Sequence, residues 1–322
     1  MDTGLSLSDQ VTLNRHYDCY LTAISSVYQM IFKKTDFKYL FLHNMYFDYS
    51  NLFDNLFKNI ILYPSKLPSE IFINSSKVLK SLSYEKKDIP MFLHTMLTDS
   101  IAIVKANLEK ISWINEEERL PLHHAFSIKK LSQNQFLIID LHMKNVPEGI
   151  IVSKYEIENA AYLIQEIHFE SCEKKSMSFF IDYFLKTAYT YFDVKYEDMI
   201  NNAFIDIINC DFDKEFQLQS DNYILIPVVR KVKEYIDTWF CFSQFLIQIG
   251  EDYRLNLNDY VQMCLDISKA WSKINMLLLA QYKTKKSYIT KGEFAQKFLI
   301  LMEKSKLLLK NIKELMEETY EY

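Results

Sequence analysis

Apolar and polar residues are arranged in short segments along the first half of the chain, in the pattern that is typical of β-strands. Three apolar segments bounded by polar residues have this character: Ile101–Leu108, Ala125–Ile128 and Phe136–Ile139. Apolar runs of this length with β-branched and aromatic residues favour strands. The polar residues 132–135 predict a turn between the last two segments. We therefore expect residues 124–140 to form a β-hairpin.

A strand followed by a helix is predicted directly after this hairpin. The segment Ile150–Val152 is apolar, and Ser153 has the side chain of a helix N-cap. A serine at this position accepts a hydrogen bond from the first turn of the helix. We expect this helix to extend through Ala161.

The apolar period changes near residue 170 from about two to about 3.6 residues. Two long segments then carry residues of one helix face at every third or fourth position: Tyr260, Cys264, Ile267, Trp271, Ile274 and Leu278 in one, and Phe298, Leu301, Ser305, Leu308, Ile312 and Leu315 in the other, where only Ser305 is polar. Each set lies on one face of a helix, and the charged segment Tyr282–Gly292 predicts the turn of an antiparallel helix hairpin. Further helices are expected over 176–193, 196–209 and 222–250, which together predict a helical bundle. We interpret the aromatic residues on these faces as packed core.

The polar segment Glu170–Ser176 separates the two patterns. A chain of 322 residues is long enough for two domains. We therefore predict an α+β domain over residues 1–169 and an α-helical domain over residues 170–322.

The composition excludes several classes of function. The net charge of −5 argues against a nucleic-acid-binding protein, which usually has a strongly basic face. The chain has only 4 glycines, and they lie too far apart for either common phosphate-binding loop. The five cysteines form no CxxC pair and no zinc-binding spacing. We expect no metal site and no bound nucleotide.

The same sequence predicts a cytoplasmic protein without a membrane partner. The N-terminus, MDTGLSLSDQ, lacks the basic and apolar regions of a signal peptide. The most apolar segment, Tyr223–Gly250, contains five charged residues and is therefore not a membrane span. An odd number of scattered cysteines is typical of a reducing compartment.

Cys19 is the first candidate for chemistry. It lies at the start of a predicted helix whose apolar face includes Leu21, Ile24 and Val27, and Asp18 is a suitable N-cap. Unpaired N–H groups and the helix dipole stabilise a thiolate in a first turn, and the thiolate is the nucleophilic form. The alternative is a small buried side chain without a chemical role.

His124 and Asp140 are the second candidates. His124 opens the first strand of the predicted hairpin and Asp140 closes the second, so the two side chains are expected within hydrogen-bonding distance. A carboxylate in this position orients an imidazole and stabilises its protonated form. The alternative is a surface contact between neighbouring strands. His123 is the weaker candidate because it points to the other face of its strand.

Two further groups favour simpler interpretations. His123, His124, His142 and Asp140 have no recognisable metal-binding spacing, so they do not predict a metal site. The lysine-rich segment Lys283–Lys291 is interpreted as a solvated loop between helices, with the docking of an acidic partner as the alternative.

These motifs together resemble papain-like C39-peptidase-type domains, and most closely the butirosin-biosynthesis H-type (BtrH N-terminal-like) family. The similar segments are DCYLTAISSVYQ around Cys19, IAIVKANL, HAFSI with FLIID, and GIIVSKYEIENAAY, and a helical C-terminal region is also similar in kind. The resemblance implies a papain-like cysteine-protease-type domain followed by an α-helical bundle. It covers most of the chain.

The resemblance also implies a catalytic triad in which Cys19 is the nucleophile, His124 the general base and acid, and Asp140 the residue that orients His124. Papain-like sites usually have a glutamine six residues before the cysteine as an oxyanion donor, and Leu13 occupies that position here. Asn14 is therefore the candidate oxyanion donor, with His16 as an alternative.

The implied function is acyl transfer in specialised-metabolite biosynthesis of the non-ribosomal peptide type in bacteria. An aminoacyl or peptidyl group would pass from the phosphopantetheine thioester of a carrier protein to Cys19 and then to a small-molecule amine. No other cofactor is implied. The same triad also allows a C39-like peptidase or amidase, and a catalytically inactive papain-like scaffold is the alternative from another class.

Overall fold

The computed structural model of the chain describes residues 19–32, 48–49, 60–61, 70–73, 76–114, 119, 123–140, 149–171, 175–211 and 226–320. The chain is of the mixed α and β class and forms two compact units. The first unit comprises residues 1–40 and 68–174. The second comprises residues 41–67 and 175–322.

This division differs from the predicted domains of 1–169 and 170–322 chiefly in the segment 41–67. Within that segment, β1 (Asp48–Tyr49) pairs with β2 (Ile60–Ile61) and contacts α8 (Tyr196–Asn209). The hydroxyl of Tyr49 donates a hydrogen bond to the carboxylate of Asp206 on α8. This tertiary contact joins the segment to the helical unit, and no sequence pattern indicated it.

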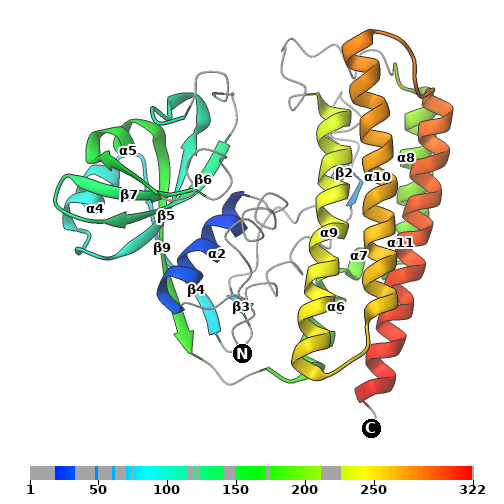
Figure 1. Cartoon of the computed structure of the whole chain (residues 1–322), viewed down its shortest axis with the longest axis horizontal. Coiled ribbons are helices and arrows are strands. Elements are labelled where there is room, and N and C mark those ends of the chain that lie inside the picture. Colours follow the sequence, from blue (N-terminus) through cyan, green and yellow to red (C-terminus); the bar gives the residue numbers. More distant parts are fainter. Residues whose placement is uncertain are drawn as a thin grey trace. The chain divides into compact units, whose positions relative to one another are not determined.

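An antiparallel sheet forms the centre of the first unit (Figure 1), with the strand order β3-β4-β9-β5-β6-β7-β8. In chain order, the strands are β3 (Glu70–Ile73), β4 (Ser76–Glu85), β5 (Ile101–Asn107), β6 (His123–Lys130), β7 (Gln135–Ile139), β8 (Ile150–Ser153) and β9 (Ala161–Ser171). The helices among the described residues of this unit are α2 (Cys19–Phe32), α4 (Ile89–Thr95), the 3₁₀ turn η2 (Leu108–Lys110) and α5 (Lys154–Ala160).

The predicted hairpin is confirmed, because β6 pairs with β7 in a register that places Ser127 opposite Ile139. The strand β8 and the helix α5 are also confirmed, with Ser153 as the N-cap in a capping box with Glu156. The long strand β9 was not predicted. It carries polar residues such as Gln165 and Glu166 among its apolar ones, so the alternating pattern is weak although the strand lies inside the sheet.

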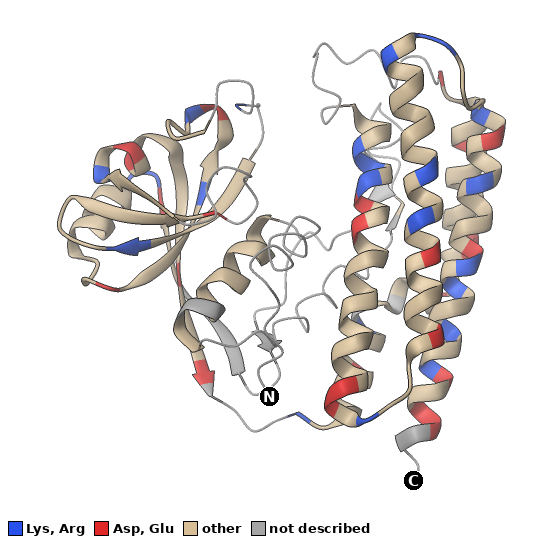
Figure 2. Cartoon of the chain, viewed as in Figure 1, with Lys and Arg blue, Asp and Glu red and all other residues tan. Residues whose placement is uncertain are grey.

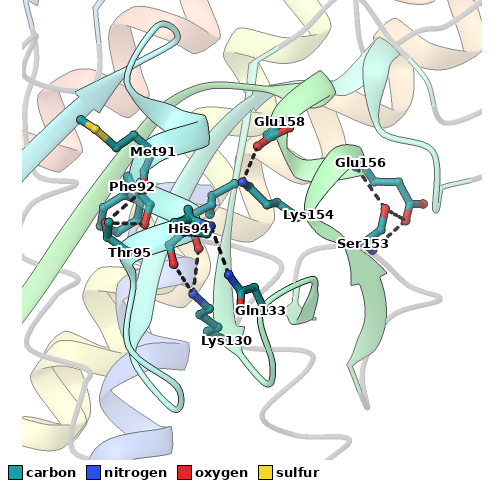
Figure 3. A network of polar contacts seen from close by, with 11 residues as sticks. Met91, Phe92, His94, Thr95, Lys130, Gln133, Ser153, Lys154, Glu156 and Glu158 are labelled. Atoms are coloured by element: carbon teal, nitrogen blue, oxygen red, sulfur yellow. Dashed lines mark hydrogen bonds and ion pairs between the residues drawn. The ribbon is translucent and has the colours of Figure 1, made fainter.

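Two lysines satisfy the C-terminal carbonyl groups of the short helices in this unit. The buried Lys130 of β6 donates hydrogen bonds of 2.9, 2.9 and 2.6 Å to the carbonyl oxygens of Leu93, His94 and Met96 at the end of α4. Figure 3 shows Lys130 beside His94. Lys86 donates to the carbonyl oxygens of Glu158, Asn159 and Ala161 at the end of α5. A positive charge at a helix C-terminus is favourable because it faces the negative end of the helix dipole.

The second unit is helical apart from β1 and β2 among the residues that the structure describes (Figure 1). Its helices are α6 (Met177–Thr187), α7 (Tyr189–Phe192), α8 (Tyr196–Asn209), α9 (Pro227–Tyr253), α10 (Asn258–Thr284) and α11 (Lys291–Tyr320). The helices expected over 176–193, 196–209 and 222–250 are therefore present, the first of them as the two segments α6 and α7.

The predicted helix hairpin is also present, and α10 packs along α9 as well as against α11. The apolar stripe of α10 is buried from Cys264 to Leu278. The ring of Trp271 stacks on that of Tyr235 of α9 with a centroid distance of 4.4 Å, and Phe298 of α11 packs edge-on against both. The aromatic residues on these helix faces are packed core, as their spacing predicts.

Charged side chains of both signs lie along α9, α10 and α11 (Figure 2). Several form ion pairs three or four positions apart, including Lys231 with Glu234 at 2.6 Å. Among the described residues, no helix has the length and apolar character that a membrane span requires.

Candidate active site

Cys19 is the first residue of α2, and its side chain is half-buried. The residues that follow, from Tyr20 to Tyr28, are all buried. In the first turn of a helix, the backbone N–H groups have no carbonyl partner within the helix and carry a partial positive charge. The proposed N-cap, Asp18, lies outside the described residues.

A hydrogen bond between the hydroxyl of Ser127 and the carbonyl oxygen of Ala23, 2.9 Å long and buried, connects β6 to α2. Ala23 lies one helical turn after Cys19, and Ser127 lies three residues after His124 on its strand. The bond therefore joins the second turn of α2 to the middle of β6.

His124 and Asp140 form the central polar contact of this region. The Nε2 atom of His124 lies 2.6 Å from Oδ2 of Asp140. The two side chains are 4% and 1% exposed, so the pair is shielded from water. His124 lies near the start of β6 and Asp140 directly follows β7, so the hairpin brings them together. The predicted pairing of these two residues is confirmed.

Cys19 contacts the same histidine. Burial by itself would lower the pKa of His124, but the charge of Asp140 and hydrogen bonds to Asp140 and Cys19 outweigh burial and raise the pKa to about 10. Because Nε2 faces Asp140, Nδ1 is the ring nitrogen left for the hydrogen bond with Cys19. His124 thus lies between a thiol and a carboxylate and is protonated at neutral pH.

Cys19, His124 and Asp140 are arranged so that a proton can pass between the sulfur and the imidazole. A protonated imidazole beside a cysteine is placed to exchange a proton with a sulfur that forms or leaves there. The buried carboxylate of Asp140 fixes the orientation of the ring and stabilises its positive charge. Cys19, His124 and Asp140 therefore have the contacts that activation of a nucleophilic sulfur requires.

A scan against protein-family models finds no match. A search of curated proteins finds no relative of this chain either. The chemical interpretation of Cys19, His124 and Asp140 therefore rests on their geometry.

Four residues next to Cys19 and His124 in the sequence or on the neighbouring strands form contacts that the sequence did not indicate: Tyr162 with His123, and Lys105 with Tyr20. The ring of Tyr162 on β9 packs edge-on against His123 with a centroid distance of 5.0 Å. Burial and the charge of Cys19 raise the pKa of Tyr162. On the neighbouring strand β5, Nζ of Lys105 lies 4.5 Å from the ring centroid of Tyr20, the residue after Cys19. His123 is exposed, which agrees with its weaker candidacy as a catalytic base.

A β-bulge explains why Tyr162 was not recognised. Lys105 pairs with Leu163 and Ala106 pairs with Ala161, so Tyr162 is the additional residue on β9. A bulge redirects the side chain of the additional residue, and such bulges are frequent next to active sites. The strand itself was not predicted, and no local sequence signal marks the bulge.

Asn14, the candidate oxyanion donor, lies outside the described residues, as do Leu13 and His16. The backbone N–H of Cys19 lies at the start of the helix, where an N–H group is suited to bind an oxyanion.

The other candidate groups do not gather into a second site among the described residues. No group of histidine, cysteine and acidic residues with metal-binding geometry occurs there, and His142 lies outside them. The described cysteines besides Cys19 are Cys210, Cys241 and Cys264, of which the last two are buried in the helical unit. Burial raises the pKa of Cys264, which keeps this thiol protonated.

Proposed function

We propose that the chain is a cysteine-dependent acyltransferase with a papain-like first unit. In this proposal, Cys19 accepts an aminoacyl or peptidyl group from a carrier-protein thioester and passes it to a small-molecule amine. The observation that carries the proposal is the buried contact of His124 with both Cys19 and Asp140.

The first half-reaction forms the acyl-enzyme. The thiolate of Cys19 attacks the carbonyl carbon of the donor thioester, and a tetrahedral intermediate forms with a negative oxygen. The bond between this carbon and the sulfur of the donor then breaks, and the departing sulfur takes the proton of His124. The products are a thioester on Cys19, a free donor thiol and a neutral His124.

The second half-reaction forms the amide. The nitrogen of the acceptor amine attacks the carbonyl carbon of the acyl-enzyme, and His124 takes a proton from that nitrogen. The bond to the sulfur of Cys19 then breaks, and the thiolate and the protonated His124 are restored. Asp140 keeps its charge throughout and stabilises the protonated ring.

The backbone N–H of Cys19 supports the negative oxygen in both half-reactions, and we propose Asn14 as the second donor. A thioester donor supplies the energy for amide formation, so the reaction needs no ATP. This agrees with a sequence that contains only 4 glycines, none placed as in a phosphate-binding loop. We propose a cytoplasmic location, because carrier-protein thioesters are made there.

Intact-mass spectrometry tests the proposal. The wild-type protein is incubated with an acyl-loaded carrier protein and, in parallel, with the butyryl thioester of N-acetylcysteamine. We expect an acyl adduct that is absent in Cys19→Ala and is consumed by an added amine to form an amide. Cys210→Ala is the matched control, because Cys210 is a half-buried thiol in the helical unit.

The outcomes separate the alternatives. An adduct that water removes faster than any amine, or the cleavage of extended peptides, indicates a peptidase or amidase. No adduct and no reaction of Cys19 with iodoacetamide indicates an inactive scaffold and contradicts the proposal.

A further inference from the structure

Lys105 is a half-buried cation on β5 that faces the residue after Cys19. Its Nζ lies 4.5 Å from the ring centroid of Tyr20, which follows Cys19 in the first turn of α2. Among the described residues, no carboxylate forms an ion pair with Lys105. A partly desolvated lysine without a negatively charged partner attracts the carboxylate of a ligand strongly, because the surrounding protein screens the charge less than water does.

Tyr162 lies on the neighbouring strand β9, next to the residue that pairs with Lys105. In the β5–β9 ladder, Lys105 pairs with Leu163, and Tyr162 is the additional residue of the bulge next to this pair. The exposed ring of His123 packs edge-on against Tyr162. Tyr162 is half-buried and interacts electrostatically with Cys19. Lys105, which faces the ring of Tyr20, and Tyr162, which interacts with Cys19, thus come from neighbouring positions of the β5–β9 ladder, and both side chains are hydrogen-bond donors.

We propose that Lys105 and Tyr162 form a subsite that binds a substrate carboxylate, and that this carboxylate belongs to the amine acceptor. The inference rests on the proposed function. It defines the acceptor class as amino acids and related amines that carry a carboxylate near the amino group.

Electrostatics favours a carboxylate on the acceptor amine over one on the acyl donor. The charge of Lys105 repels a purely cationic amine, whereas a carboxylate on the amine turns this repulsion into attraction. A donor on a carrier protein is already held by its protein and by its phosphopantetheine arm. The phosphate of that arm lies at the opposite end from the thioester, so it does not reach a lysine beside Cys19. A free small amine has only its own groups for orientation, and a charged anchor supplies this.

The test compares two acceptors that differ in the carboxylate alone. Butyryl-enzyme is formed from the butyryl thioester of N-acetylcysteamine, and the rates of amide formation with alanine and with alaninamide are measured. The ratio of the two rates is the selectivity for the carboxylate. Comparing this ratio between variants cancels the different intrinsic reactivities of the two amines.

We expect Lys105→Met to lower the selectivity by about 10- to 100-fold, the effect of losing a hydrogen bond to a charged group. We expect Lys105→Arg to retain most of the selectivity for alanine over alaninamide. Tyr162→Phe should lower this selectivity by about tenfold. Lys87→Met is the control, because Lys87 is an exposed lysine in the turn before α4 and the substitution makes the same change in net charge. Circular dichroism establishes that each variant is folded.

Three outcomes overturn the inference. An unchanged selectivity in folded Lys105→Met contradicts the subsite and leaves the proposed function intact. In a second comparison, Cys19 is acylated by a succinyl thioester, which carries a carboxylate, and by a butyryl thioester, which does not. If Lys105→Met lowers the ratio of these two acylation rates and leaves the acceptor selectivity unchanged, the carboxylate belongs to the donor. The absence of any acyl adduct on Cys19 in the wild-type protein contradicts the proposed function and the inference together.

Discussion

The hydroxyl of Ser127 on β6 donates a hydrogen bond of 2.9 Å to the carbonyl oxygen of Ala23 on α2, across 104 residues of sequence. Both residues are buried. This bond connects the element that carries Cys19 to the strand that carries His124. It lies one helical turn from Cys19 and three residues from His124.

We expect Ser127→Ala to cost about 1 kcal/mol in the free energy of unfolding, the usual net value of one hydrogen bond. The rate of Cys19 acylation should fall by about tenfold, because small displacements of reacting groups lower rates strongly. Urea unfolding and intact-mass kinetics measure the two effects. Ser132→Ala, in the exposed turn between β6 and β7, is the control for both. Unchanged acylation in Ser127→Ala would show that this bond does not position Cys19.

The second prediction concerns the roles of the two members of the His–Asp pair. We expect His124→Gln to slow the acylation of Cys19 by about 10²- to 10⁴-fold, the typical contribution of acid–base catalysis. Asp140→Asn should have a smaller effect, because it removes the charge that supports the ring and leaves the ring in place. Single-turnover kinetics measure both rates. His168→Gln is the control, since His168 is exposed on β9. A His124→Gln rate within a few-fold of the wild type would exclude His124 as the base.

The third prediction is the titration of His124. Burial lowers its pKa, but Asp140 and Cys19 raise the pKa to about 10. Nuclear magnetic resonance of the ring nitrogens should therefore show a protonated ring at neutral pH in the wild-type protein. Asp140→Asn removes the negative charge that raises the pKa of His124 most. The pKa of His124 should therefore fall, and the ring should become neutral at a lower pH. A neutral ring at pH 7 in the wild type would contradict the charge network.

The same shift predicts how stability depends on pH. The pKa in the folded protein, about 10, lies above the ordinary value of 6.5. The contribution of His124 to the free energy of unfolding is therefore fully present below about pH 6.5 and is lost as the pH rises to about 10. The difference in stability between the wild type and His124→Gln should shrink over this interval. A difference that grows with pH would contradict the prediction.

The fourth prediction compares two neighbouring lysines on β6. Lys130 is buried and donates to three carbonyl oxygens at the end of α4, whereas Lys129 forms a 2.8 Å ion pair with the exposed Asp99. We expect Lys130→Met to lower the free energy of unfolding by about 3 kcal/mol, because buried carbonyl groups lose their donor. Lys129→Met should cost about 0.5 kcal/mol or less, as surface ion pairs usually do. Equal losses in urea unfolding would show that Lys130 is not a stabilising cap.

The sequence by itself determined the elements whose local pattern is strong. The β6–β7 hairpin, the capped helix α5 and the helix hairpin of α10 and α11 each have a periodic apolar pattern and a clear turn or cap. The pairing of His124 with Asp140 follows from the hairpin, because two short strands joined by a tight turn bring their outer ends together. Cys19 at the start of a helix follows from the apolar face of α2.

Only the tertiary structure decided which of these elements meet. The sequence contains no signal that α2 packs on β6, because the Ser127–Ala23 bond joins a side chain to a backbone group that every residue has. The strand β9 lies inside the sheet although its pattern is partly polar, since its neighbours β4 and β5 satisfy its backbone. The bulge at Tyr162 arises from the register of β5 and β9, so the neighbouring positions of Tyr162 and Lys105 are a property of the assembled sheet.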